Sequence, residues 1–191
     1  MKIAIYGGSF NPPHTGHQMV AALVLATQDI DELWFMPTHT HMLGKQLLDY
    51  EHRFEMCRLM SKMFGNKASV SRAELRMSRQ PGFKGSETVQ LIRYIQEEFP
   101  KDKFRLVMGS DLLDSFVTWG GWAEIIEKAP PIVVHRSGYS TPSPLQFGKS
   151  FILPDVSSTE VKKAMLAGEN VNSLVPRDVL SYIRENKLYE A

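Results

Sequence analysis

Short apolar segments alternate with longer amphipathic segments along the whole chain. Apolar runs of about four to eight residues are typical of buried strands, and apolar residues three and four positions apart are typical of helices. The pattern predicts strands at 2–6, 32–37, 104–109, 131–136 and 150–154, with a weaker strand at 68–71. It predicts helices at 17–28, 50–64, 86–99, 121–129, 157–168 and 176–189.

This alternation favours an α/β fold, a Rossmann-like doubly wound parallel sheet with helices on both faces. The length of 191 residues suits a single domain, which we expect over 1–191. In such a sheet ligands bind beyond the carboxyl ends of the strands, where the strand order reverses. Residues that directly follow a strand are therefore the first candidates for a functional site.

The segment GGSFNPPHTGH, residues 7–17, follows the first predicted strand. We expect Gly7 and Gly8 to let the backbone turn sharply and approach a ligand. The next helix begins near His14, and a helix N-terminus binds anions, most often phosphate. His14 and His17 share one face of the first turn, where imidazoles can donate hydrogen bonds to a phosphate. The segment therefore predicts a phosphate site.

Other interpretations of this segment are weaker. It matches neither GxGxxG nor GxxxxGK[ST], so it indicates neither a dinucleotide fingerprint nor a P-loop. A zinc site could combine the two histidines with HTH at 39–41, but no Cys, Asp or Glu stands nearby at ligand spacing. Each histidine by itself would more often cap a helix or lie on the surface.

A second helix start, in the segment SSTEVKK near the other end of the chain, is also suited to phosphate. Ser157 and Glu160 have the spacing of a capping box, which predicts Ser157 as the N-cap. A well-capped helix would by itself explain that pair. Ser158, Thr159 and Lys162 add two hydroxyls and a cation, and two helix N-termini at one sheet edge would suit a polyphosphate.

Composition narrows the class of partner. Lys and Arg total 22 and Asp and Glu total 21, so the net charge of +1 attracts neither nucleic acid nor a membrane surface. No apolar run is long enough to span a bilayer, and the N-terminal apolar stretch is too short for a signal peptide. The single cysteine, Cys57, lies among apolar residues and is expected to be a buried thiol. These features fit a cytoplasmic protein and do not indicate an oligomeric state.

GGSFNPPHTGH and SSTEVK together resemble the motifs of the nucleotidylyltransferases, which carry HxGH and a late SSTxxR. Within that superfamily the chain is similar to the nicotinate and nicotinamide mononucleotide adenylyltransferases. Four further segments each resemble a family motif less specifically but occur in the family's order: HRFEMCRLM, MGSDLLDSFVTW, VVHRSG and VPRDVLSYIRENKLY. The resemblance covers nearly the whole chain and implies the nucleotidylyltransferase type of Rossmann-like fold. It also implies adenylyl transfer from ATP to a pyridine mononucleotide with release of pyrophosphate, a step of NAD biosynthesis.

The resemblance further implies roles for individual residues. His14 and His17 would be catalytic and would contact the phosphates of ATP. ATP would also be bound by Gly8, Ser9, Phe10, Ser158, Thr159, Lys162 and Arg136, and the pyridine mononucleotide by Lys45, Asp111 and Trp119. Mg²⁺ would arrive with ATP rather than in a cage of protein ligands. By contrast, helical spacing favours a core position for Trp122, and Arg53 and Arg58 are expected to be solvated.

Departures from the family pattern bear on the substrate. Lys162 stands where arginine is usual, which keeps the attraction for phosphate but loses a bidentate contact. Two segments resemble those of the eukaryotic-type enzymes, PTHTHMLGK and GSETVQLI. The first motif, GGSFNPPHTGH, instead resembles that of the bacterial enzymes and favours nicotinate as the substrate. Nicotinamide mononucleotide as the preferred or an equal substrate stays open. So do another HxGH nucleotidylyltransferase and a non-catalytic nucleotide sensor.

Overall fold

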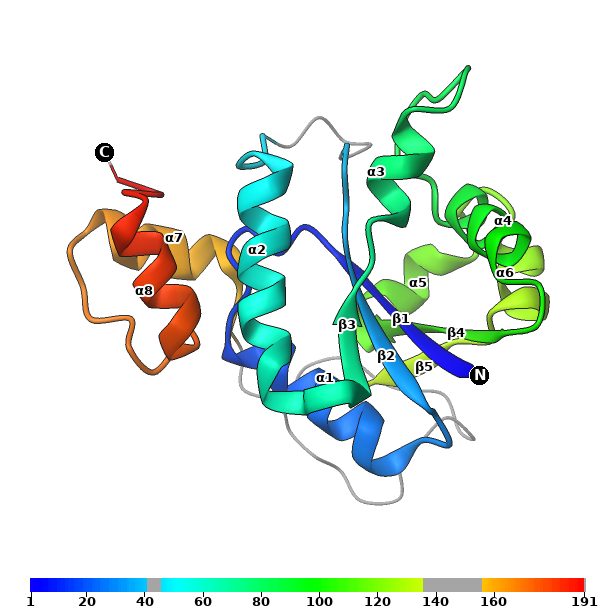
Figure 1. Ribbon diagram of the computed structural model, residues 1–191, viewed down its shortest axis with the longest axis horizontal. Coiled ribbons are helices and arrows are strands. Elements are labelled where there is room, and N and C mark those ends of the chain that lie inside the picture. Colours follow the sequence, from blue (N-terminus) through cyan, green and yellow to red (C-terminus); the bar gives the residue numbers. More distant parts are fainter. Residues whose placement is uncertain (41–45, 136–155, 191) are drawn as a thin grey trace.

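The computed structural model describes residues 1–40, 46–135 and 156–190. In this part of the chain the strands are β1 (Lys2–Gly8), β2 (Glu32–Pro37), β3 (Ala68–Val70), β4 (Lys103–Gly109) and β5 (Ile132–Val134). All pair in parallel, in the order β3-β2-β1-β4-β5 (Figure 1). The chain moves outward from β1 to β3 and then returns to the other side of β1. The strand order therefore reverses between β1 and β4, as in other doubly wound sheets.

Helices cover both faces of the sheet, as the alternation of elements predicts. On one face the core includes residues of α1 (Thr15–Thr27), α2 (Tyr50–Ser61), α7 (Ser158–Leu166) and α8 (Arg177–Glu185). On the other it includes residues of α3 (Ala73–Ser78), α4 (Thr88–Glu98), α5 (Leu113–Phe116) and α6 (Trp122–Lys128). Two short 3₁₀ helices, η1 (Lys62–Lys67) and η2 (Ser110–Leu112), follow α2 and β4.

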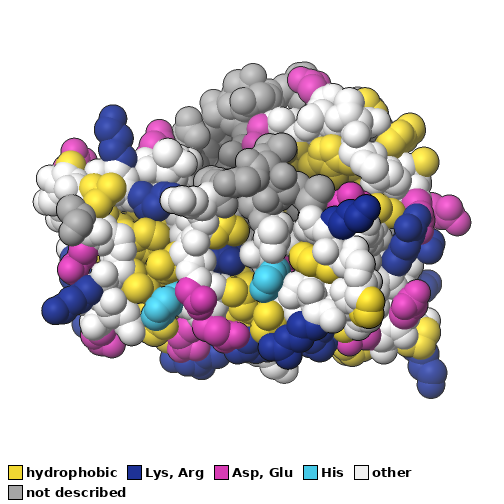
Figure 2. All heavy atoms as spheres, turned by 90° about the horizontal axis from the view of Figure 1, so that it is seen from above, with side chains coloured by type: hydrophobic (Ala, Val, Ile, Leu, Met, Phe, Trp, Pro, Cys, Tyr) yellow, Lys and Arg dark blue, Asp and Glu magenta, His cyan; other side chains and the backbone are white. Residues whose placement is uncertain are grey.

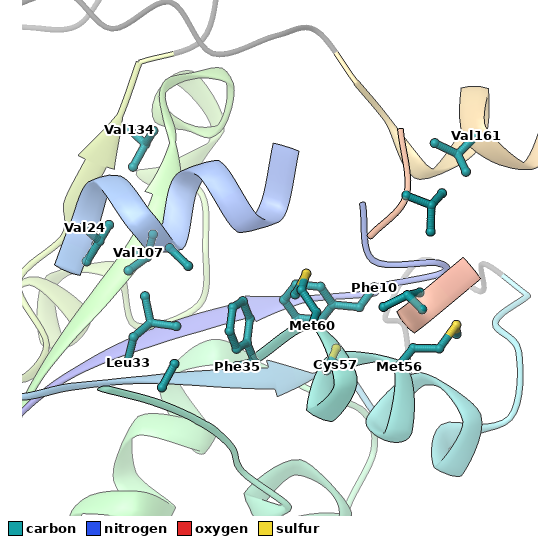
Figure 3. Close-up of a cluster of buried hydrophobic side chains, with 14 of the residues drawn as sticks. Phe10, Val24, Leu33, Phe35, Met56, Cys57, Met60, Val107, Val134 and Val161 are labelled. Atoms are coloured by element: carbon teal, nitrogen blue, oxygen red, sulfur yellow. The ribbon is translucent and has the colours of Figure 1, made fainter. Parts of the chain in front are cut away.

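Successive residues of each strand supply the two cores in turn. In β1, Ala4 belongs to the core beneath α1 and α2, whereas Ile3 and Ile5 belong to the core beneath α3 and α4. Because both faces are buried, the strands are apolar along their length, which is why their positions are easy to predict. Cys57 lies in the core beneath α1 and α2, which Figure 3 shows, and its predicted burial is confirmed.

The predicted elements differ from the structure in a few places. The helix predicted over 50–64 gives way to η1 after Ser61. The short helices α3 and α5 were not predicted, because six and four residues are too few to display a helical period. The strand expected at 150–154 lies outside the described residues.

Candidate active site

A cavity of about 170 Å³ opens at the carboxyl ends of β1 and β4, where the strand order reverses. His17 and Asp111 both line it, from α1 and η2 respectively. The rest of its lining is Tyr6, Gly7, Val20, Val107, Met108, Gly109, Leu112 and Val134. The cavity therefore lies where a doubly wound sheet binds its ligand, and it joins residues of the first motif to the segment after β4.

The backbone turn of the first motif is displaced from its predicted position. Gly7 and Gly8 do not turn but continue β1, paired with Met36 and Pro37 of β2. The turn follows at Phe10, whose φ of 44° lies in the left-handed region. Gly8 is needed for a different reason, because a Cβ atom there would lie 3.3 Å from the Phe10 ring.

The side chain of Phe10 anchors the motif in the core. Its ring is fully buried and packs edge-on against Tyr6 and Phe35, with centroids 5.6 and 5.8 Å apart. Figure 3 shows it among the side chains of α2 that include Met56 and Met60. Burying a large aromatic ring stabilises by a few kcal/mol, on the order of 2–3, which can offset the cost of a positive φ. Any contact of Phe10 with a nucleotide is thus left to its backbone.

The two histidines of the motif lie side by side. Their ring centroids are 3.7 Å apart and their planes are inclined by 33°. His14 is the N-cap of α1 and is buried, whereas His17 reaches the wall of the cavity. The backbone N–H of His14 donates to Nδ1 of His17 over 3.1 Å. Because Nδ1 accepts, a neutral His17 carries its proton on Nε2, the nitrogen that can donate to a ligand.

The late motif begins α7 directly beside the first motif. Ser157 is the N-cap, and its hydroxyl accepts from the N–H of Glu160 over 3.2 Å, so the predicted capping box is confirmed. Hydrogen bonds from Ser157 hold the pKa of the Glu160 carboxylate below its ordinary value, with a smaller contribution from His14. The hydroxyl of Ser158 donates to the carbonyl of Pro12 over 2.8 Å. The N-termini of α1 and α7 therefore meet at one sheet edge.

The remaining predicted residues have different outcomes. Thr159 is exposed and Lys162 partly buried on α7, one turn after Ser158. Arg136 and Lys45 lie outside the described residues. Trp119 is partly buried, packs edge-on against Phe116 at 5.4 Å at the margin of the core beneath α4, and does not line the His17 cavity.

Two predictions about neighbouring side chains are wrong. Trp122 is not a core residue, because it is 40% exposed at the start of α6, where Ile125 instead faces the core. Arg53 is not solvated, because its side chain is 1% exposed. The signal for Arg53 was available: Met56, Cys57 and Met60 follow it at helical spacing, which places Arg53 on the apolar face of α2.

Figure 2 shows acidic and basic side chains intermixed on the face it displays, in keeping with the net charge of +1. In the three described stretches of chain, no helix is both long and apolar enough to cross a bilayer. Within the same residues, no three His, Cys, Asp or Glu side chains gather as a metal site would require.

Comparison with known proteins places this geometry in context. The sequence matches the cytidylyltransferase-like family over residues 5–164. A probable nicotinate-nucleotide adenylyltransferase of Myxococcus xanthus is 37% identical over 99% of this chain and 95% of its own length. The nicotinate-nucleotide adenylyltransferase of Bacillus subtilis is 32% identical over 100% of this chain and 99% of its own length. The solved structure of the Plasmodium falciparum nicotinic acid mononucleotide adenylyltransferase complexed with NaAD has a TM-score of 0.78 at 21% identity, covering 98% of this chain and 97% of that one.

Proposed function

The chain belongs to the cytidylyltransferase-like family and, within it, to the nicotinate-nucleotide adenylyltransferases, and we propose that it joins ATP and nicotinate mononucleotide to give deamido-NAD and pyrophosphate. The observation that carries this proposal is the adjacent pair of His14 and His17 at the switch-point cavity, with the N-terminus of α7 beside it. Two helix N-termini and a histidine donor at one sheet edge suit a polyphosphate substrate.

The chemistry asks little of the protein beyond placement and charge. A 5′-phosphate oxygen of the mononucleotide attacks the α-phosphorus of ATP, a new O–P bond forms, and the bond to the leaving pyrophosphate breaks. The attacking group is already an anion, so no general base is needed and no covalent enzyme intermediate forms. The protein contributes by aligning the two substrates and by stabilising charge on the phosphoryl oxygens.

Each part of the ATP site has a distinct role in this proposal. Nε2 of His17 donates to the α-phosphate, and His14 assists at the polyphosphate. The Ser158 hydroxyl turns from the Pro12 carbonyl to a phosphate oxygen, with Lys162 one turn along the helix. The backbone at Gly8, Ser9 and Phe10, together with Thr159 and Arg136, completes the ATP site, and Mg²⁺ arrives bound to ATP.

The mononucleotide is assigned to three other residues. Lys45 holds its phosphate, Asp111 contacts it from the cavity wall, and Trp119 stacks on the pyridine ring. Asp111 lines the same cavity as His17, which supports a contact close to the reacting phosphates. The preference for nicotinate rests on two observations. The first motif resembles that of the bacterial enzymes, and relatives that match this chain over nearly its whole length are named nicotinate-nucleotide adenylyltransferases.

Loss of the Lys162 ammonium is expected to weaken ATP binding. Lys162→Ala should raise KM for ATP about fivefold, the equivalent of roughly 1 kcal/mol for one hydrogen bond to a charged group near solvent. Lys162→Arg should be tolerated, because arginine also donates to phosphate. Lys163→Ala, on an exposed neighbour, is the control. If the KM for ATP is unchanged in Lys162→Ala, the late motif is only the capped start of a helix and does not bind ATP.

Loss of the Trp119 indole is expected to act on the other substrate. Trp119→Ala should raise KM for the mononucleotide about tenfold, or 1.4 kcal/mol, and leave KM for ATP nearly unchanged, because a flat indole stacks on a pyridine ring. Trp119→Phe should recover part of the loss. Trp122→Ala removes an exposed indole three positions along the chain, at the start of α6, and should alter neither constant by more than about twofold. The reverse pattern would transfer the role to Trp122.

The experiment that tests the proposed function is pyrophosphate release from ATP with each mononucleotide in turn. We expect kcat/KM to be higher for nicotinate mononucleotide than for nicotinamide mononucleotide. Equal values would refute the nicotinate preference while leaving the reaction intact. If no pyrophosphate is released with either mononucleotide, the result would favour a non-catalytic nucleotide sensor.

A further inference from the structure

A buried guanidinium joins three segments around the proposed active site. Arg53 of α2 donates from Nε to the carbonyl of Leu48 over 2.8 Å. Its Nη1 donates to the carbonyls of Ser9 and Thr38, over 3.0 and 2.7 Å. Ser9 lies in the loop after β1, Thr38 follows β2, and Leu48 precedes α2. Arg53 therefore fixes the first motif relative to both neighbouring segments.

The same loop is also held from the far end of the chain. The Oδ1 atom of Asn11, itself only 3% exposed, accepts a hydrogen bond from the hydroxyl of Tyr189 over 2.7 Å. It also accepts from the backbone N–H of Leu48 over 3.4 Å. Leu48 thus bonds to Asn11 through its N–H and to Arg53 through its carbonyl. Burial raises the pKa of the Tyr189 phenol, so this hydroxyl stays a neutral donor.

Packing alone does not explain an arginine at this place. Removing a guanidinium from water is costly unless its N–H groups are satisfied, and an apolar side chain would fill the space at less cost. The hydrogen-bond acceptors that the structure describes for Arg53 are backbone carbonyls, which need donors when they are buried outside regular ladders. The side chain therefore serves the loops that it bonds.

We propose that Arg53, Asn11 and Tyr189 are positioning residues, a buried polar layer that sets the geometry of the loop over residues 9–12, which leads into α1 and its histidines His14 and His17. The proposal rests on the proposed adenylyl transfer. The layer lies behind the loop rather than in the cavity lining, so it acts through the backbone of residues 9–12 and contacts no reacting atom. It also makes Tyr189, after the last helix, part of the support of a site built at the N-terminus.

Removing the Tyr189 hydroxyl is the sharpest test, because the chain offers a matched control. Tyr189→Phe loses the bond to Asn11, and Tyr182→Phe loses a bond of similar length, 2.8 Å, from α8 to Nδ1 of His52. Both variants should fold with similar small losses in Tm. We expect kcat/KM to fall roughly tenfold in Tyr189→Phe, mainly through kcat, because small displacements of reacting groups cost large factors in rate. Tyr182→Phe should stay within about twofold of wild type.

Arg53 provides the second arm. Arg53→Met should lower kcat roughly 10²-fold, and Arg53→Lys should recover part of that loss because it restores one cationic donor. Arg58→Met is the control, since Arg58 lies exposed on the same helix and pairs with Glu55. All assays are run well below the Tm of each variant. If Arg53→Met does not fold, Arg53→Lys and Tyr189→Phe carry the test.

The outcomes separate this inference from the proposed function. The positioning role is wrong if the wild type transfers the adenylyl group while Tyr189→Phe matches Tyr182→Phe, and Arg53→Met (Arg53→Lys where Arg53→Met does not fold) matches Arg58→Met, in every constant. If the wild type releases no pyrophosphate, the proposed function is wrong, and ATP affinity by calorimetry becomes the readout. A loss of ATP affinity in Tyr189→Phe but not in Tyr182→Phe would then support the positioning layer, and equal affinities would overturn it.

Discussion

Replacing His17 by alanine is expected to lower kcat for adenylyl transfer by roughly 10²-fold or more, the scale of losing one donor to a transition state. His17 is the imidazole at the wall of the switch-point cavity, and the N–H of His14 holds its Nδ1 as an acceptor. Its Nε2–H is therefore available as a donor, and in the proposed reaction it donates to the α-phosphate. KM should change less than kcat, because the bond gains strength as charge develops on the phosphoryl oxygens.

The His17 substitution can be checked against variants that separate donor from bulk. His17→Gln, with an amide N–H near the Nε2 position, should recover part of the loss, whereas His17→Asn should not. His52→Ala removes a histidine of α2 that lies away from the cavity and should leave kcat unchanged. The melting temperature of His17→Ala should stay close to wild type, since His17 is only partly buried. Near wild-type turnover in His17→Ala would exclude its catalytic role.

The fold could be predicted because its main signals are local. Strands buried on both faces are apolar along their length, so β1, β2, β4 and β5 were each located to within a few residues. Parallel strands place their carboxyl ends at one edge, so the site followed from the first strand alone. The sequence also indicated two helix N-termini at that edge, and in the structure the bond from Ser158 to the Pro12 carbonyl joins them.

What could not be predicted depends on contacts between distant residues. Nothing near Tyr189 in the sequence indicates that its hydroxyl bonds Asn11, 178 positions away. The turn was predicted at Gly7 and Gly8, because glycine most readily adopts a left-handed backbone conformation. In the structure it lies at Phe10, whose buried ring stabilises the positive φ. Trp122 has the spacing of a core residue, but the short helix α6 points Ile125 inward instead.

The glycine between the two histidines is explained by the structure rather than by backbone freedom. Gly16 is in the first turn of α1, where an L-residue fits without strain, and alanine there should favour the helix by roughly 0.5–1 kcal/mol. A Cβ atom at Gly16, however, would lie 3.0 Å from Nδ1 and 3.1 Å from Cε1 of His14. Contacts this short require the His14 ring to move.

Gly16→Ala is therefore expected to separate stability from activity. The Tm should stay level or rise, while kcat falls on the order of 10- to 100-fold, because a displaced His14 ring also disturbs the His17 ring stacked against it at 3.7 Å. The route through His14 is tested by a double-mutant cycle. In a His14→Ala background the added methyl meets no ring, so Gly16→Ala should cost little further kcat. An additive loss in that background would show that the methyl acts elsewhere, with the Val156 carbonyl, 3.7 Å from the modified position, as the next contact to examine.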